Sequence, residues 1–401
     1  MCTIAAPAGG AIDQVVVTYF PAPASYTGDD VVEISAHGSP VVLNAIVKAV
    51  VSAGARLAEP GEFTLRAFLN GRIDLMQAEA VADLIDAATP LQARAAFDQL
   101  NGTLTLAIAT IDAALFDLVA RLEASVDFPE EGYHFVAPGE LAAAIDAIRE
   151  RTTSLLRDAK RGRILREGLQ VAIVGAPNVG KSSLFNALVG ASRAIVTEIP
   201  GTTRDLVSET IDLEGLRVVV VDTAGLRATD DRVESEGVSR AAAAAASADL
   251  ILFVVDLSTE SSASTEEMLN GVLSAVTTKR VVVANKSDLP ARRDRGAAIA
   301  VSALTGMGLD ELRRAIVKAL DIELMADRPD ITNIRHIALV ERADQSLARA
   351  RTAALADGRS MSEEFVLADL QDARIALEEV TGRRAPEDLL AHIFSQFCIG
   401  K

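Results

Sequence analysis

The chain has 401 residues, of which 50% are hydrophobic, and a formal net charge of −17. This length and composition allow a large buried core and suggest two to four domains. The acidic balance argues against a free-standing nucleic-acid binder, because contacts to phosphates dominate the affinity of such proteins. Binding to RNA would need a local basic patch or a partner that supplies the positive field.

Cysteine and histidine usage excludes two further classes of protein. Two cysteines, Cys2 and Cys398, cannot make a disulfide framework, and the four histidines are scattered without the spacing of metal ligands. We see no signal peptide and no apolar run long enough to span a bilayer. We therefore expect a cytoplasmic protein with no membrane contact and no transition-metal site.

The N-terminal stretch mixes short strands with one helix. Strands are predicted at 14–19 and 31–35 and a helix at 41–51, separated by turns rich in glycine and proline. The pattern predicts a small α+β domain over residues 1–70.

Amphipathic helices lie on both sides of the central part of the chain. Apolar residues recur at helical spacing over 104–122 and again over 366–380. Neither flank has an α/β pattern of its own, so we expect one all-α helical domain, residues 71–165 and 329–401, interrupted by another domain at 166–328. Insertion at a loop tip costs little closure entropy.

The densest basic stretch lies just before the central domain. It consists of Arg157, Lys160, Arg161, Arg163 and Arg166. Such a run is either a solvated helix face or linker, or an RNA site, and the first interpretation is favoured.

The central domain alternates strands with helical stretches. Strands are predicted at 169–174, 206–213, 216–221, 250–256, 280–284 and 297–301, and the turn Glu214-Gly215 joins the second and third as a hairpin. The pattern predicts a doubly wound, Ras-like α/β domain with one antiparallel edge strand.

The first strand of this domain leads into GAPNVGKSS, Gly175 to Ser183, which satisfies the phosphate-loop pattern GxxxxGK[ST]. Backbone N–H groups of the loop and the positive end of the following helix would cradle phosphates. Lys181 would reach the β and γ phosphates, and Ser182 would place a hydroxyl on Mg²⁺. A glycine-rich turn without function is the alternative, and the later strings disfavour it.

Two further strings predict a switch that senses the γ phosphate. In DTAG, Asp222 ends a predicted strand and would hold Mg²⁺ through water, and Gly225 would donate its N–H to the γ phosphate. In PGTTRD, Thr203 is the expected second hydroxyl on Mg²⁺, from a loop that orders only when that phosphate is present.

The strings NKSD (285–288) and SAL (302–304) select the base. The Asp288 carboxylate would accept two hydrogen bonds from guanine, Asn285 would serve the other edge, and the stem of Lys286 would lie over the ring. Adenine offers no such pair of donors, so ATP would leave the carboxylate unpaired. The predicted GTP-binding residues are Asn178, Val179, Gly180, Lys181, Ser182, Ser183, Thr197, Thr202, Thr203, Asp222, Thr223, Ala224, Gly225, Asn285, Lys286, Asp288, Ser302, Ala303 and Leu304.

The switch lacks the water-orienting glutamine that many small GTPases have. Many small GTPases place a glutamine after DTAG to orient the attacking water, but here Leu226 follows Gly225. No arginine finger is identifiable, although Arg204 and Arg227 are candidates by position.

Residues outside the switch resemble one family. The strings are SYTGDDVVEISAHGSP (25–40), EPGEFTLRAFLNGRIDLMQAEAVADLIDA (59–87), FPEE (128–131), LREG (165–168) and FCIGK (397–401). Together they look like the tRNA-modification GTPases called MnmE or TrmE, and the resemblance covers essentially the whole chain.

The resemblance implies an N-terminal folate-binding and dimerising domain ahead of a helical domain split by a G domain. It also implies a homodimer that works with the FAD-dependent protein MnmG as a heterotetramer. The two proteins would modify C5 of the tRNA wobble uridine, with 5-formyl- or 5,10-methylene-tetrahydrofolate as the one-carbon donor.

Several site residues follow only from the resemblance. Glu33, Arg72 and Lys401 match positions that contact the folate, and Arg72 stands where a lysine is common. Family members begin with a strand and a glycine-rich, arginine-bearing turn that precede the point where this sequence starts. We therefore expect an unpaired sheet edge and one folate contact fewer.

The resemblance also implies how hydrolysis proceeds without the glutamine. Glu234 would orient water, although from the residues alone it is a helix N-terminal acid. A K⁺ ion, held by Asn178 with groups of Thr197, Ile199 and Thr202, would supply the missing positive charge. The predicted catalytic residues are Glu234, Lys181, Thr203 and Cys398.

Cys398 and the function as a whole keep alternatives. Cys398 is either a small buried hydrophobe or a reactive thiol near the one-carbon site, and the last residues fit a prenylation motif poorly. The main rival function is a ribosome-assembly GTPase of the Era or Der kind, which would carry a basic RNA-binding domain after the G domain. A folate-binding scaffold with a degenerate switch is disfavoured because all five strings are intact.

Overall fold

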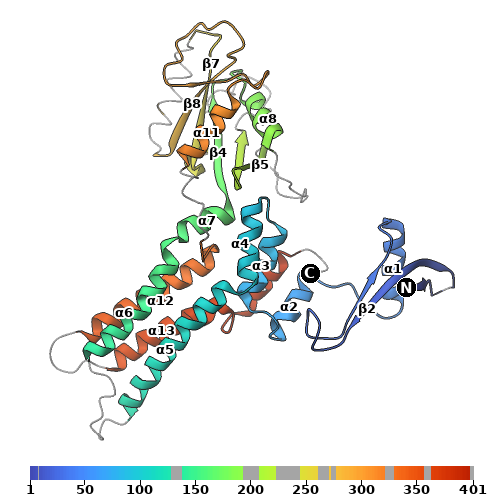
Figure 1. Ribbon diagram of the computed structural model, residues 1–401, viewed down its shortest axis with the longest axis vertical. Coiled ribbons are helices and arrows are strands. Elements are labelled where there is room, and N and C mark those ends of the chain that lie inside the picture. The colour runs from blue at the N-terminus through green and yellow to red at the C-terminus, as the bar shows by residue number, and fades with distance from the viewer. Residues whose placement is uncertain are drawn as a thin grey trace. The chain divides into compact units, whose positions relative to one another are not determined.

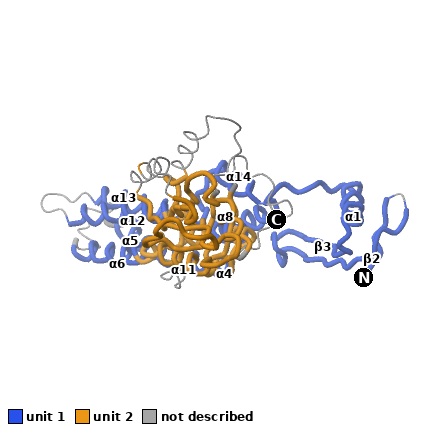
Figure 2. Tube along the Cα trace, turned by 90° about the horizontal axis from the view of Figure 1, so that it is seen from above, with its two compact units in different colours: residues 1–82, 97–153, 338–401 blue, residues 83–96, 154–337 orange. Residues whose placement is uncertain are grey.

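The computed structural model describes residues 1–7, 9–127, 138–192, 207–222, 244–260, 271, 277–320, 329–355 and 363–397. The chain divides into two compact units, coloured blue and orange in Figure 2. Unit 1 comprises residues 1–82, 97–153 and 338–401, and unit 2 comprises residues 83–96 and 154–337. Most of unit 2 is therefore inserted, in sequence, between two parts of unit 1.

Unit 2 is built on a six-stranded sheet of order β5-β6-β4-β7-β8-β9. All neighbours pair in parallel except β5, which is antiparallel to β6. The strands are β4 (Leu169–Gly175), β5 (Val207–Leu213), β6 (Leu216–Asp222), β7 (Leu250–Asp256), β8 (Lys279–Asn285) and β9 (Ile299–Ala300). The predicted doubly wound sheet with one antiparallel edge is confirmed, and its last strand is shorter than predicted.

Both faces of this sheet are buried. Along β4, Val171 and Ile173 belong to one apolar cluster, whereas Ala172 and Val174 belong to another. The first cluster includes residues of α8 (Lys181–Ser192) and α11 (Leu309–Ala319), which Figure 1 shows beside the strands. Burial on both faces explains why the inner strands β4, β6 and β7 are nearly continuous apolar runs, whereas the edge strand β5 alternates.

The hairpin between β5 and β6 turns at Glu214 and Gly215. Both residues have positive φ, 53° and 88°, as a two-residue type I′ turn requires. A Cβ on Gly215 would also lie 2.7 Å from Cδ1 of Leu91, so a larger residue here would have to displace the Leu91 side chain as well as adopt a positive φ. The predicted hairpin is confirmed.

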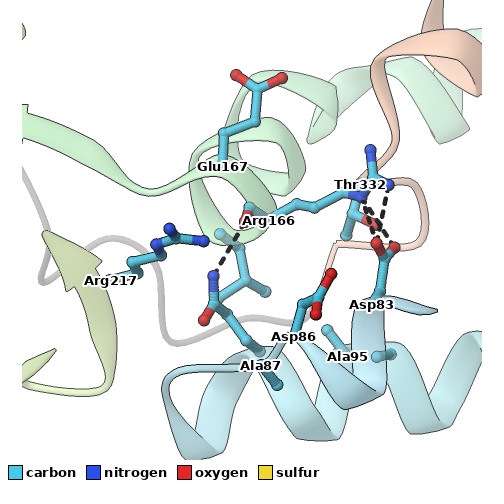
Figure 3. Close-up of a pocket in the computed structure, with 11 residues that line it drawn as sticks. Asp83, Asp86, Ala87, Ala95, Arg166, Glu167, Arg217 and Thr332 are labelled. Carbon is cyan, nitrogen blue, oxygen red and sulfur yellow. Dashed lines mark hydrogen bonds and ion pairs between the residues drawn. The ribbon is translucent and has the colours of Figure 1, made fainter. Parts of the chain in front are cut away.

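A junction within unit 2 ties the helix that precedes its first strand to two earlier helices (Figure 3). The residues come from α3 (Leu75–Ile85), α4 (Pro90–Leu100) and α7 (Ala159–Glu167). Nε of Arg166 donates to both carboxylate oxygens of Asp83, at 2.9 and 2.8 Å, and the Gln92 amide donates to the Arg166 carbonyl at 2.9 Å. These groups line a cavity of about 200 Å³.

The basic stretch is largely paired with acids. Arg166 pairs with Asp83, Arg161 with Asp158 at 3.2 Å, and Arg163 with Glu167 at 2.8 Å. Most of the basic side chains in this stretch are therefore paired with acidic side chains of the same chain. This pairing favours the helix-face interpretation over an RNA site.

Unit 1 contains a bundle of helices. They include α5 (Thr103–Asp127), α6 (Pro138–Arg157), α12 (Ile334–Ala354), α13 (Glu363–Thr381) and α14 (Glu387–Ser395). Helices α5 and α13 pack together with their apolar faces buried, and Arg374 pairs with Asp112 across them at 3.2 Å. Arg149 of α6 pairs with Asp344 of α12 at 3.2 Å. The all-α assignment of this part is confirmed.

One bundle helix also bears on the membrane prediction. The segment Thr103–Ala124 is long and apolar enough to cross a membrane by length and composition, so the statement that no run is long enough was wrong. Its buried residues, including Leu104, Ile108 and Leu115, recur at helical spacing, and the helix packs against α13. Packing against α13 accounts for the buried face of this helix, which is 33% of the apolar window.

The N-terminal part of unit 1 is a small sheet with helices. Strands β1 (Cys2–Ala5), β2 (Ala11–Phe20) and β3 (Val31–Ser35) form an antiparallel sheet in that order, followed by α1 (Pro40–Ser52) and α2 (Glu62–Leu69). The α+β class is confirmed. Strand β1 was not predicted, because it is short and mostly exposed. Within the described residues, β1 and β3 each pair only with β2.

Candidate functional site

Four strands of unit 2 end at the same edge of the sheet. Asp222 ends β6 in register with Ile173 of β4, and Asp256 ends β7 in register with Asn285, the last residue of β8. Gly175 ends β4. In an open parallel sheet, ligands bind outside the carboxyl ends of the strands. The phosphate-loop and NKSD strings therefore meet at the edge where such a fold binds its ligand.

The phosphate loop joins β4 to the start of α8. Because α8 begins at Lys181, its first N–H groups have no acceptor within the helix and its positive end points into the loop. The Lys181 ammonium donates to the carbonyls of Gly175 and Ala176 at 2.9 and 2.8 Å. Ser182 and Ser183 are exposed at the same helix start. The helix N-terminus, the Lys181 ammonium and the two serine hydroxyls together offer donors and positive charge that fit a phosphate group.

Two residues of the loop have left-handed backbone conformations. Asn178 has φ 62° and Gly180 has φ 91°. A Cβ on Gly180 would overlap the side-chain amide of Asn285. Position 180 therefore requires glycine, and the phosphate loop has a backbone conformation that most other residues disfavour.

Asn285 braces the loop from behind. Its side chain is 2% exposed; Nδ2 donates to the Val179 carbonyl at 2.9 Å, and Oδ1 accepts from the Ala303 N–H at 3.1 Å. The amide therefore links the phosphate loop to the SAL loop. Both of its ends are used inside the protein, and its predicted contact with the guanine edge stays a prediction.

Lys286 makes a second link to the phosphate loop. It also has positive φ, 63°, and its ammonium donates to the Asn178 carbonyl at 3.0 Å and to the Asp256 carboxylate at 2.6 Å. Burial opposes ionisation of Asp256, but hydrogen bonds from Lys286 and Ser258 outweigh it and lower the pKa of the carboxyl. Asp256 is not among the predicted site residues, although a carboxylate that closes the apolar run LILFVV is a signal visible in the sequence.

The other residues that are predicted to contact the base lie around Lys286 and Asp256. Asp288 is exposed in the turn after β8, with its carboxylate at the surface of this edge. Ser302 is buried and its hydroxyl accepts from the Thr305 N–H at 3.1 Å, whereas Leu304 is 86% exposed. The SAL loop is therefore fixed by its serine, and its leucine is free to contact a ligand.

Ten predicted site residues lie outside the described residues. They are Thr197, Ile199, Thr202, Thr203, Thr223, Ala224, Gly225, Glu234, Cys398 and Lys401. The backbone of Asp222 is placed and its side chain is not described. Among the described residues, no cluster of histidine, cysteine and carboxylates could hold a metal ion.

Two predicted folate residues lie in unit 1. Glu33 lies on β3 opposite Thr18, and Arg72 follows α2; both are exposed. Arg72 lines a cavity of about 580 Å³ together with Asp74, Gln77 and other residues of the bundle. Asp74 is already engaged, because it accepts from the Thr105 hydroxyl at 2.5 Å.

Comparison with known proteins places the chain in one family. The family model described as GTP-binding protein TrmE N-terminus matches residues 1–72, and the one described as MnmE helical domain matches residues 75–398. A solved structure of Era from Aquifex aeolicus is 27% identical and covers 48% of this chain and 69% of that chain, with a TM-score of 0.30, which is too low to carry an argument.

Curated relatives match over nearly the whole sequence. The tRNA modification GTPase MnmE of Aquifex aeolicus (strain VF5) is 45% identical, covering 98% of this chain and 88% of the relative. Those of Koribacter versatilis (strain Ellin345) and Azoarcus sp. (strain BH72) are 45% and 43% identical, each covering 98% of this chain and 87% of the relative. The chain belongs to the MnmE family.

Proposed function

We propose that this chain binds and hydrolyses GTP and takes part in tRNA modification. The observation that carries the GTP assignment is the braced loop at the strand ends, where Asn285 and Lys286 both bond to carbonyls of the phosphate loop. A site that is already ordered by such contacts loses little conformational freedom when it binds. The names of the relatives carry the tRNA assignment.

Binding of GTP would use the groups that this edge offers. Lys181 would exchange its two loop carbonyls for the β and γ phosphates, with loop N–H groups around them. The exposed Ser182 hydroxyl, with Thr203, would hold Mg²⁺ and Asp222 would act through water. Asp288 would accept the two donors of guanine, and this requirement excludes adenine.

Hydrolysis would need a water-orienting group and a cation. We assign Glu234 to the water and Asn178, Thr197, Ile199 and Thr202 to K⁺. Of these, Asn178 is described, and its exposed side chain on a strained loop fits a ligand to a monovalent cation. Mg²⁺ and K⁺, when bound, would offset the negative charge that builds on the phosphates.

For the modification itself, we propose the chemistry that the family resemblance implies. Glu33, Arg72 and Lys401 would hold 5-formyl- or 5,10-methylene-tetrahydrofolate, and Cys398 would lie near the one-carbon unit. A homodimer of this chain would join an FAD-dependent MnmG-like protein, as a heterotetramer, to modify C5 of the wobble uridine in the cytoplasm.

The GTP assignment is tested by binding and hydrolysis measurements on the full chain. We expect GTP to bind far more tightly than ATP, and hydrolysis to rise with K⁺ but not with Na⁺. Asn178→Ala should lose the K⁺ response while still binding GTP. Glu234→Ala should keep binding and slow hydrolysis by roughly one to three orders of magnitude, as for loss of a water-positioning group. Equal binding of ATP and GTP would contradict the assignment.

The tRNA assignment needs a cellular measurement. Nucleoside analysis of tRNA from cells that lack this protein should show loss of a C5 substituent from wobble uridines. Complementation with the intact chain should restore it, and unchanged nucleosides in the deletion would contradict the proposal.

A further inference from the structure

Asp256 belongs to none of the five motif strings, yet it lies at the centre of the site. It ends β7, is 6% exposed, and lies in register with Asn285. One carboxylate oxygen accepts from the backbone N–H and the hydroxyl of Ser258 at 2.8 and 2.7 Å, and the other accepts from the Lys286 ammonium at 2.6 Å. Both carboxylate oxygens thus accept hydrogen bonds from within the protein.

Lys286 connects the Asp256 carboxylate to the phosphate loop. Its ammonium lies between the Asp256 carboxylate and the Asn178 carbonyl, which is 3.0 Å away. Both Lys286 and Asn178 have positive φ, a conformation that is uncommon for lysine and that asparagine tolerates more readily. Of the described contacts, this ammonium bridge is the one that fixes the Asn178 carbonyl.

We propose that Asp256 is a positioning residue that couples guanine recognition to the cation site. It fixes the Lys286 ammonium, which in turn fixes the backbone of Asn178 and hence the direction of its side chain. The inference rests on the proposed function, because Lys286 is assigned to the base and Asn178 to K⁺. It assigns a role to a residue outside the family strings, and it predicts that base binding and cation affinity change together.

A purely structural role for Asp256 is the alternative. Its hydrogen bonds to Ser258 close the turn after β7 and would stabilise the domain without affecting the ligand. The two roles differ in one respect: only the coupling role runs through Lys286.

The first test compares Asp256→Asn with Ser258→Ala in the full-length chain. The asparagine keeps the shape and removes the charge, whereas the alanine removes one hydrogen bond and keeps the charge. We expect Asp256→Asn to weaken GTP binding about tenfold, and to raise the K⁺ concentration for half-maximal hydrolysis by a similar factor, since a charged hydrogen bond is lost. Ser258→Ala should change both by less than about twofold.

The second test is a double-mutant cycle with Lys286→Met. If Asp256 acts through Lys286, Asp256→Asn should have no further effect on GTP affinity in the Lys286→Met background. Equal losses in both backgrounds would overturn the inference, as would a lower melting temperature with an unchanged K⁺ requirement. Should Asp256→Asn fail to fold, Asp256→Glu replaces it, because it keeps the charge and displaces it by one methylene; a folded Asp256→Glu with wild-type K⁺ dependence would overturn the inference.

The wild-type chain separates the two proposals. A chain without GTP preference contradicts the proposed function, and the coupling with it. A chain that prefers GTP and responds to K⁺, with an Asp256→Asn variant that matches it, contradicts the coupling alone.

Discussion

The nucleotide edge of unit 2 holds its candidate residues differently from the proposed folate face of unit 1, that is, the exposed residues Glu33 and Arg72. At the nucleotide edge, Lys181, Asn285 and Lys286 each donate to a carbonyl of the phosphate loop. On the folate face, Glu33 and Arg72 are exposed, and the described part of the chain offers neither side chain a hydrogen bond or an ion pair.

This difference has an energetic consequence. Groups that are already fixed lose little side-chain entropy on binding, whereas each exposed arginine or glutamate loses about 0.5–1.5 kcal/mol when it is immobilised. The nucleotide edge is therefore a preformed site. The residues proposed to bind folate are not preformed in this way, so a ligand would have to order them.

The largest effect expected at the preformed site is loss of base selection. Asp288→Asn replaces the carboxylate that would accept both guanine donors. We expect GTP binding to weaken by roughly 2–5 kcal/mol, with preference relaxed toward xanthine nucleotides. Isothermal titration with GTP and XTP measures both changes.

The matched control for that variant is Asp294→Asn, which alters another exposed aspartate beyond the same strand. It should leave GTP affinity unchanged. Similar losses from the two variants would show that general charge, rather than base recognition, governs binding.

The second prediction concerns the brace itself. Asn285→Ala removes a buried amide and leaves the Val179 carbonyl and the Ala303 N–H without this partner. Unpaired buried groups cost about 1–3 kcal/mol each, so we expect unit 2 to lose roughly 2–4 kcal/mol of stability together with GTP affinity. Thermal unfolding with and without GTP tests this; loss of affinity at unchanged stability would instead favour direct contact with the base.

The sequence predicts most of unit 2 because its local signals agree. Continuous apolar runs predict β4, β6, β7 and β8, and alternation predicts β5, each to within about two residues. The turn Glu214-Gly215 specifies its own hairpin. Strand β1 was missed because an exposed strand of four residues has no such pattern. The domain boundaries at 70, 165 and 328 stay predictions.

The sequence predicts only those parts of the site that lie within the motif strings. The strings identify the loops, but the bracing role of Asn285 and the position of Asp256 depend on the register of β7 against β8. That register is a long-range property, set by how the strands pack, and no local string carries it.

The third prediction moves to the folate face. Arg72→Ala should weaken binding of a tetrahydrofolate by about 1.5–3 kcal/mol, the value of one charged hydrogen bond, and lower tRNA modification accordingly. GTP affinity should stay unchanged, because the nucleotide contacts lie in unit 2. Arg72→Lys, which restores a positive charge, is the control and should recover part of the binding. Retained folate affinity in Arg72→Ala would remove this residue from the site.

The smallest expected effect concerns Glu62. Unlike Glu33 and Arg72, this residue in the N-terminal part of unit 1 is held by several hydrogen bonds. Hydrogen bonds from Arg56, together with those from the Glu59 N–H and Arg66, lower the pKa of Glu62 from an ordinary value near 4.5 to about 2. Because the folded value lies below the unfolded one, this contribution to stability is full above about pH 4.5 and is lost as the pH falls toward 2. Hydrogen exchange of the amides of α2 should therefore be faster in Glu62→Gln than in wild type at pH 6, and the difference should shrink as the pH approaches 2.

Glu59→Gln, the control for this variant, alters a neighbouring exposed carboxylate and should match wild type throughout. A difference that stays constant with pH would mean that Glu62 acts through its shape rather than its charge, and this part of unit 1 would then have no electrostatic counterpart to the braces at the nucleotide edge.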